Sequence, residues 1–382
     1  MLFRSKLKRA GVHRALEGFW SVPDARERPA GEAWGLTGVR AEGQPGARMT
    51  VAFGVGEEGG DSGARLGLYY LEHPGMGAME VRVDGETVAR LPEREPVEEA
   101  AQVASWPVKG RSHIVEVLNV GRAPVTVFGA ALDLERPGVR YDALGLPGST
   151  SMMADGFDKR VYARQLRARA ADLYVLFYGT NESAISRLDP EKLRRHYTSL
   201  LATLRRASPR ADCLILGPTD RLKRDHDRWV EAPSINTVIR VLRELARDEN
   251  CGFWSARAAM GGPRSIARWQ QLEPPLGHPD GVHLTRRGYE TLAHSFTDDL
   301  LGAYRAWLAA DGEPVPELPE DEEPTAAAER RRDAASGEDE PRSAGATAPA
   351  DAEAQGSDRQ RAADPARPDA EADEDAASGE GQ

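Results

Sequence analysis

The sequence predicts two folded domains, a β sandwich or jelly roll followed by an α/β domain, and an acidic tail. Short apolar segments separated by turn residues fill positions 33–135, a spacing typical of sandwiches and jelly rolls. From about residue 136 strands alternate with helices, which indicates a parallel sheet with helices on both faces. Residues 311–382 contain 22 acidic residues, 7 arginines and no aromatic residue. Such a segment cannot bury enough apolar surface to fold, so we expect a disordered tail.

The charge distribution limits the classes of partner. The whole chain has a net charge of −11, but without the tail residues 1–310 carry +4. This mildly positive part has no basic stripe with interleaved aromatic residues, so we expect no nucleic-acid binding. No apolar run reaches the roughly 18 residues of a membrane span, and we expect no transmembrane segment. The tail shows no feature that identifies a partner.

The two cysteines, Cys213 and Cys251, each stand at the start of a predicted strand. We expect two small buried residues at these positions, because free cysteine packs as a small apolar side chain. A disulfide between adjacent strands is the alternative.

In the first domain we predict six strands, at 49–55, 64–71, 78–83, 101–108, 113–120 and 124–132. Asp84-Gly85 supplies the turn of a hairpin within Val81–Val88, because this dipeptide favours two-residue hairpin loops. Residues 1–32 precede this pattern, and we interpret them as an N-terminal segment, a possible remnant of the second domain.

In the second domain the predicted strands are 139–144, 173–178, 213–217 and 252–255, and the predicted helices are 158–170, 190–207, 234–248 and 285–309. The uninterrupted apolar run Leu173–Phe177 is typical of a strand buried on both faces. The domain would span residues 136–310.

Polar residues follow these strands where a ligand would bind, since ligands of open α/β sheets bind at the carboxyl ends of the strands. Gly148 follows the first strand, and Gly179-Thr180-Asn181-Glu182 follows the second. Asp280-Gly281-Val282-His283 precedes the last helix. A carboxylate three residues before an imidazole can orient it as a general base, and an asparagine amide can donate to an oxyanion.

These motifs resemble three of the four blocks of the SGNH/GDSL hydrolase superfamily, over about residues 139–308. The resemblance implies an SGNH-like, flavodoxin-like fold with Gly148 and Asn181 in the oxyanion hole and Asp280 and His283 as the catalytic pair. More narrowly, the chain resembles bacterial polysaccharide and peptidoglycan O-acetylesterases that contain an inserted carbohydrate-binding-like jelly roll. Met260–Ser265 matches a loop of that subgroup, and Trp269 beyond it would line the substrate cleft or pack in the core.

The nucleophile block of the family is a strand that runs into Gly-Asp-Ser and then a helix. Residues 1–30 contain no such strand, so we expect the block to be missing and the chain to be truncated at its N-terminus. Three serines within the chain are alternatives. Ser62 lies in Gly60-Asp61-Ser62-Gly63, but a strand follows it; Ser149 and Ser151 lie beside Gly148.

The resemblance implies an esterase that removes acyl groups, most simply O-acetyl groups, from a carbohydrate or cell-wall glycan by Ser-His-Asp acyl transfer, without a metal or organic cofactor. An inactive SGNH-fold glycan-binding protein and a glycan O-acetyltransferase are the alternatives. The family implies a periplasmic or extracellular location; the chain shows no signal peptide, which leaves the cytoplasm open. His226, between Asp225 and Asp227, is interpreted as part of a charged loop, because no second ligand group has metal-site spacing.

Overall fold

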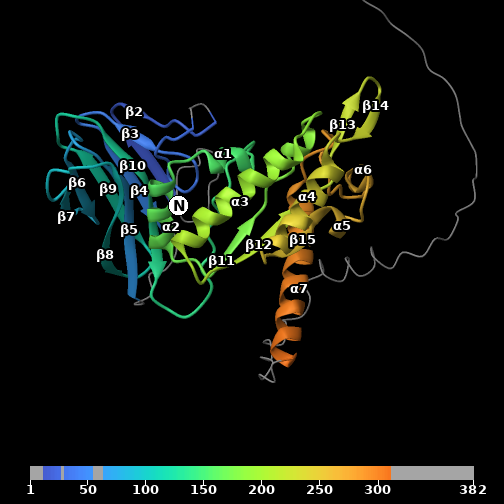
Figure 1. Ribbon diagram of the computed structural model, residues 1–382. Coiled ribbons are helices and arrows are strands. Elements are labelled where there is room, and N and C mark those ends of the chain that lie inside the picture. Colours follow the sequence, from blue (N-terminus) through green and yellow to red (C-terminus); the bar gives the residue numbers. More distant parts are fainter. Residues whose placement is uncertain (1–11, 27–29, 55–62, 311–382) are drawn as a thin grey trace, which may run out of the picture. The chain divides into compact units, whose positions relative to one another are not determined.

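A computed structural model describes residues 12–26, 30–54 and 63–310. The first part of the chain forms two antiparallel sheets (Figure 1), each of five strands. The first sheet has the order β1-β4-β9-β6-β7 and the second β2-β3-β10-β5-β8. The strands of the first sheet are β1 (Val12–Glu17), β4 (Arg48–Phe53), β9 (His113–Asn119), β6 (Met79–Val83) and β7 (Glu86–Leu91). Those of the second are β2 (Trp20–Ser21), β3 (Ala41–Gly43), β10 (Val125–Leu134), β5 (Gly63–Glu72) and β8 (Ala100–Lys109).

The core of this sandwich comes from alternate residues of its strands. In β4 the buried residues are Met49, Val51 and Phe53, which pack in one cluster with Leu66 and Val127 of the second sheet. Alternation arises because successive side chains of a strand point to opposite faces. This confirms the predicted β-sandwich class.

The predicted hairpin turn is present between β6 and β7. Asp84 and Gly85 both have positive φ, 52° and 87°, as a type I′ turn requires. Glycine adopts this conformation without strain, which explains the dipeptide at this point.

The sandwich contains two strands that lie ahead of Ala33, where we expected it to begin. Strand β1 pairs with β4 along six residues, and β2 pairs with β3. Strands β1 and β2 of segment 1–32 therefore belong to the sandwich sheets. Ala25 of the same segment packs in the core cluster of the α/β domain.

The second part of the chain is an α/β domain around a three-stranded parallel sheet of order β11-β12-β15. Its strands are β11 (Leu173–Leu176), β12 (Asp212–Gly217) and β15 (Gly252–Ser255), and β13 (Leu222–Asp225) and β14 (Arg228–Glu231) form a separate hairpin. The helices are α1 (Ser151–Asp155), α2 (Lys159–Arg169), η1 (Glu182–Ala184), α3 (Pro190–Ala207), α4 (Ile235–Asp248), α5 (Ala256–Ala259), α6 (Ser265–Gln270) and α7 (Arg286–Ala310). All four predicted helices are present.

Aspartate caps fix the starts of two of these helices. The Asp158 side chain accepts hydrogen bonds from the backbone at the start of α2, and Asp189 does the same for α3, where Pro190 is the first helical residue. Caps of this kind satisfy donors that a helix leaves free at its N-terminus.

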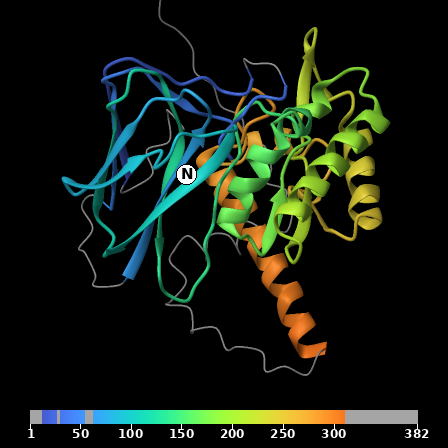
Figure 2. The ribbon, with the colours of Figure 1, turned by 60° about the vertical axis from the view of Figure 1, so that its left-hand side comes forward.

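Helices pack on both faces of the sheet, as predicted. On one face Ile215 packs with Val238 and Leu242 of α4 within one buried cluster. On the other, the Trp254 ring lies 5.2 Å from that of Phe296 in α7 and its indole donates to Asp299. Helix α7, orange in Figures 1 and 2, continues beyond the sheet.

Two strand predictions were wrong. Residues 139–144 form no strand, and Val139 is 98% exposed. Strand β11 is an edge strand, and Leu173 and Val175 are each 41% exposed instead of buried. Strand β12 pairs with one edge of β11, but the described residues supply no strand at its other edge, and the face that carries Leu173 and Val175 is only partly covered.

The cysteines form a disulfide, which corrects the expectation of two separate buried residues. Cys213 and Cys251 have Cα atoms 4.9 Å apart. The register explains the contact: β12 and β15 are parallel and Leu214 is opposite Gly252, so the residues before these positions are also neighbours.

Arg169 at the end of α2 connects this domain with the sandwich. Its guanidinium donates to Asp133 of β10, to the Tyr69 hydroxyl of β5, and to Asp142 in the following segment. Burial alone would lower the pKa of the guanidinium, but the hydrogen bonds outweigh it and raise the pKa. Asp142 thus holds the segment that we predicted to be a strand.

Candidate active site

Asp280 and His283 lie together in the loop between α6 and α7. The His283 Nδ1 atom is 2.7 Å from Asp280 Oδ2. Asp280 Oδ1 accepts hydrogen bonds from the backbone N–H groups of Val282 and His283, each at 2.9 Å. Partial burial would raise the pKa of Asp280, but these hydrogen bonds outweigh it and lower the pKa to about 2. The carboxylate is therefore charged and fixed on one nitrogen of the imidazole.

The remaining nitrogen of His283, Nε2, is available for proton transfer. With Nδ1 donating to Asp280, Nε2 carries the lone pair. The side chain is 68% exposed, and Nε2 has no hydrogen-bond partner among the residues that the structure describes. This arrangement suits a general base.

Gly281 allows the tight turn between the two residues. Its φ is +73°, and a Cβ atom there would lie 2.8 Å from the Trp229 ring. Both the backbone conformation and the contact exclude a larger side chain without strain.

The Asn181 loop follows β11, and the hydrogen bonds that the buried Glu182 carboxylate accepts fix its position. The Asn181 amide donates to the Ser149 carbonyl at 2.9 Å. Glu182 is 3% exposed and accepts from the Gly179 N–H, the Ser151 N–H and the Ser151 hydroxyl. Sequence reasoning included Glu182 in the motif but assigned it no role; its position directly after the asparagine was the available signal.

The Gly148 turn and the Asn181 loop are therefore neighbours. Gly148 has a φ of +78°, and the Ser149 hydroxyl donates to the Leu146 carbonyl at 2.6 Å. Ser151 begins α1, is 1% exposed and is engaged by Glu182. Ser62 lies outside the described residues. No hydrogen bond joins His283 to Ser149 or Ser151 in the described part of the chain.

Arg221 lies between the Asn181 loop and the Asp280 loop. It donates from Nη1 to the Thr180 carbonyl at 2.7 Å, and the charge of Asp280 acts on it. The next residue, Leu222, donates its N–H to the Gly281 carbonyl at 2.8 Å. Nothing in the sequence pattern singled out Arg221, since the contact between the loops is tertiary.

A buried ion pair holds the loop that carries Arg221. Asp220 is fully buried and accepts from Arg257 Nε at 2.8 Å and from the Ile266 N–H at 3.1 Å. Arg257 also donates to Asn236 and Glu231. All these groups are paired, so the cluster stabilises the loop and has no free donor for a ligand.

Trp269 is partly buried and packs against the cluster that contains Ile266 and Leu284. Its backbone carbonyl accepts from Leu276 and Gly277. The His226 side chain is 94% exposed, and in the described chain its ion-pair partner is Asp225. The described residues contain no group of three or more His, Cys, Asp or Glu residues positioned to hold a metal ion.

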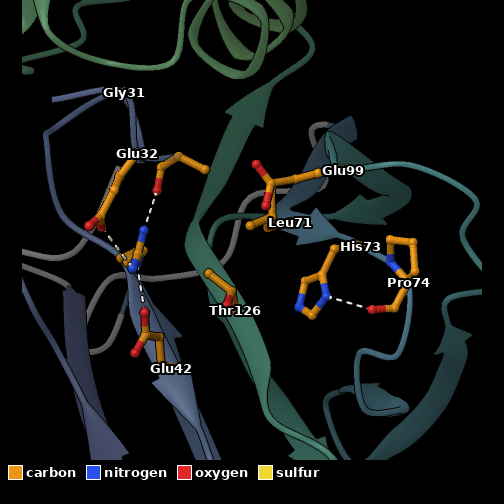
Figure 3. Close-up of a pocket in the computed structure, with 10 residues that line it drawn as sticks. Gly31, Glu32, Glu42, Leu71, His73, Pro74, Glu99 and Thr126 are labelled. Atoms are coloured by element: carbon orange, nitrogen blue, oxygen red, sulfur yellow. Dashed lines mark hydrogen bonds and ion pairs between the residues drawn. The ribbon is translucent and has the colours of Figure 1, made fainter. Parts of the chain in front are cut away.

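An open pocket of about 590 Å³ lies in the sandwich (Figure 3), and none of the candidate catalytic or oxyanion-hole residues lines it. Arg40 in its wall donates to Glu42 and to the Ala33 carbonyl and pairs with Glu32. Figure 3 shows His73 hydrogen-bonded to Pro74 on the opposite wall. The pocket has charged walls but no pair of groups arranged for proton transfer.

Comparisons with known proteins agree with these motifs. Residues 113–291 match the model of the GDSL-like lipase/acylhydrolase family. A solved structure of a peptidoglycan O-acetylesterase aligns with a TM-score of 0.64 and 23% identity, covering 79% of this chain and 80% of that one. Residues 113–291 are therefore similar to the GDSL-like lipase/acylhydrolase family, and the fold is similar to that of the peptidoglycan O-acetylesterase. This confirms the resemblance drawn from Asn181, Asp280 and His283.

Two other solved structures align over part of this chain with lower TM-scores. A family two carbohydrate esterase mutant from Clostridium thermocellum aligns with a TM-score of 0.32 and 11% identity, over 75% of this chain and 98% of that one. An acetyl xylan esterase aligns with a TM-score of 0.30 and 21% identity, over 41% and 78%. No curated protein matches the sequence. None of the described helices is long and apolar enough to cross a bilayer.

Proposed function

We propose that this SGNH/GDSL protein is an esterase that removes O-acetyl groups from a carbohydrate. The observation that carries the proposal is the Asp280–His283 pair, with a 2.7 Å contact on Nδ1 and an Nε2 that has no partner in the described chain. The similarity to a peptidoglycan O-acetylesterase supports the substrate class.

In the proposed reaction His283 Nε2 takes the proton of a serine hydroxyl as its oxygen attacks the acetyl carbonyl. Asp280 keeps the proton on Nδ1 and stabilises the imidazolium. The Asn181 amide and the Gly148 backbone N–H donate to the oxyanion. The C–O bond to the sugar breaks, and His283 returns the proton to the sugar oxygen. Water, deprotonated by His283, then releases acetate and restores the serine.

The serine itself is to be assigned by experiment. Among the described candidates Ser149 is better placed than Ser151, because its backbone already contacts Asn181 whereas Ser151 is buried on Glu182. A fluorophosphonate probe, which labels activated serines, followed by peptide mass spectrometry would identify the residue. Labelling at Ser62, Ser149 or Ser151 assigns it within this chain.

The decisive assay is acetate release from O-acetylated glycans by the full chain. We expect His283→Ala to abolish release, because no other described base is paired with a carboxylate in this loop. His278→Ala is the matched control, since His278 is an exposed histidine in the same loop. Full activity of His283→Ala would refute the assignment.

A glycan-binding protein without catalysis is the second candidate. Its support is that the hydroxyls of Ser149 and Ser151 both donate to other groups, to the Leu146 carbonyl and to Glu182. It predicts glycan binding with neither acetate release nor probe labelling. The same residues could also catalyse acetyl transfer to a glycan acceptor. This reaction would yield an acetylated acceptor in place of free acetate.

We infer a periplasmic or extracellular location from the Cys213–Cys251 disulfide. Disulfides persist in oxidising compartments and are rare in the cytosol of most organisms. Thiol labelling of protein taken directly from cells tests this inference. Two free thiols in the native protein would contradict it.

A further inference from the structure

Arg221 has more hydrogen-bonding capacity than its surroundings use. A guanidinium has five N–H donors, and within the described chain that of Arg221 makes one hydrogen bond, from Nη1 to the Thr180 carbonyl. Its Nε atom is buried and has no partner among the described residues. A buried donor without a partner costs free energy, and its burial leaves only the terminal nitrogens of the guanidinium within reach of a ligand.

The other arginines with buried side chains near the domain core differ from Arg221. Arg169 donates to Asp133, Asp142 and Tyr69, and Arg257 donates to Asp220, Asn236 and Glu231. Each of them has at least one carboxylate partner. Arg221 forms no ion pair with a described carboxylate, although burial lowers the pKa of its guanidinium and so disfavours its charge.

Asp280 is the carboxylate whose charge acts on Arg221, but both of its oxygens already accept other hydrogen bonds. Oδ1 accepts from two backbone N–H groups and Oδ2 from His283. It acts on Arg221 as a nearby charge and makes no hydrogen bond with it. The unused donors of Arg221 are therefore available to a ligand at the point where the Asn181 and Asp280 loops meet.

We propose that Arg221 binds a carboxylate of the substrate, so that the enzyme acts on esters of acidic glycans, in which the esterified sugar or its neighbour carries a carboxylate. This inference rests on the proposed esterase function and specifies its substrate class. The planar guanidinium binds a carboxylate through two parallel hydrogen bonds, and its two terminal nitrogens present such a pair of donors. A neutral glycan would leave the guanidinium without an ion-pair partner.

The first experiment measures binding, which does not depend on catalysis. Calorimetry compares hexagalacturonate, which carries a carboxylate on every sugar, with neutral xylohexaose, using the full chain. We expect the acidic oligosaccharide to bind about tenfold more tightly, as one charge-assisted contact allows. Equal affinities for the two oligosaccharides would overturn the proposal without any variant.

The second experiment compares variants. Arg221→Gln should remove the preference for hexagalacturonate, and Arg221→Lys should keep part of it because a charge remains. Arg224→Gln is the matched control: Arg224 is exposed, lies three residues along the chain, and has no ion pair among the described residues. Thermal unfolding of each variant shows whether it is folded. A folded Arg221→Gln protein that keeps the preference would overturn the proposal.

Acetate release separates this inference from the proposed function. On acetylated oligogalacturonate and acetylated xylo-oligosaccharide, Arg221→Gln should lower kcat/KM about tenfold on the acidic substrate and little on the neutral one. An equal loss on both would assign Arg221 to the oxyanion or to loop support and refute the carboxylate contact. If binding shows the preference while neither substrate releases acetate, the esterase proposal fails and the anionic subsite stands.

Discussion

Replacing Asp280 by asparagine tests the role of the carboxylate with little change of shape. The new side chain would keep an oxygen for the backbone N–H groups of Val282 and His283, which Oδ1 now accepts at 2.9 Å. Its amide nitrogen would face His283 Nδ1 in place of Oδ2. Because the amide is a donor, the imidazole would have to accept at Nδ1 and carry its proton on Nε2. The Asp280→Asn variant therefore holds the wrong tautomer for a general base.

The magnitude follows from this tautomer change. In serine hydrolases with the same relay, an Asp to Asn change leaves the geometry intact and lowers kcat about 10⁴-fold. We expect a comparable loss here, about 5 kcal/mol at about 1.4 kcal/mol per tenfold. The side chain of Asp280 is 45% exposed, so the effect on the free energy of unfolding should be small by comparison.

The assay is acetate release by wild type and Asp280→Asn across the acidic pH range. Asp280 has a pKa lowered to about 2, below its ordinary value of about 3.9. Its stabilising contribution is thus complete above about pH 4 and is lost as the pH falls towards about 2. The acid limb of the wild-type profile should therefore lie well above the pKa of Asp280 and report another group. An Asp280→Asn enzyme with activity close to that of wild type would refute the role of Asp280 in orienting His283.

Three further substitutions test the structure around the site. Arg257→Met should lower the free energy of unfolding by about 3–5 kcal/mol in urea titrations, because it leaves the buried Asp220 without its cation; a change below about 1 kcal/mol would contradict the buried ion pair. Gly281→Ala should lower both Tm and acetate release, since it combines a φ of +73° with a 2.8 Å contact on Trp229; an unchanged Tm would exclude this tight turn. Glu182→Gln replaces one carboxylate oxygen with an NH2 donor, so it removes the acceptor of at least one of the three hydrogen bonds and should cost about 1–3 kcal/mol in the same titration; a neutral result would mean that the Glu182 carboxylate does not support the loop.

The structure places together residues that the sequence could only name. The motif D-x-x-H puts Asp280 and His283 within one loop, so their contact could be predicted from local geometry. The rule that parallel strands end at the same edge predicted Asn181 at the end of β11, but Gly148 follows no strand, and its turn is joined to the Asn181 loop by the hydrogen bond from Asn181 to the Ser149 carbonyl. Arg221 could not be predicted, because its role depends on the contact of two loops that are distant in sequence.

Local sequence determined four helices, six of the sandwich strands, the Asp84-Gly85 turn and the Asp280 loop, because capping, alternation and turn preference act between residues that are close along the chain. Tertiary structure decided the remainder. Residues 139–144 have strand-like composition but no partner strand, Leu173 lies on an uncovered edge strand, and Cys213 meets Cys251 through the register of β12 and β15. Burial and pairing depend on which surfaces meet, and a single sequence states only what each segment can contribute.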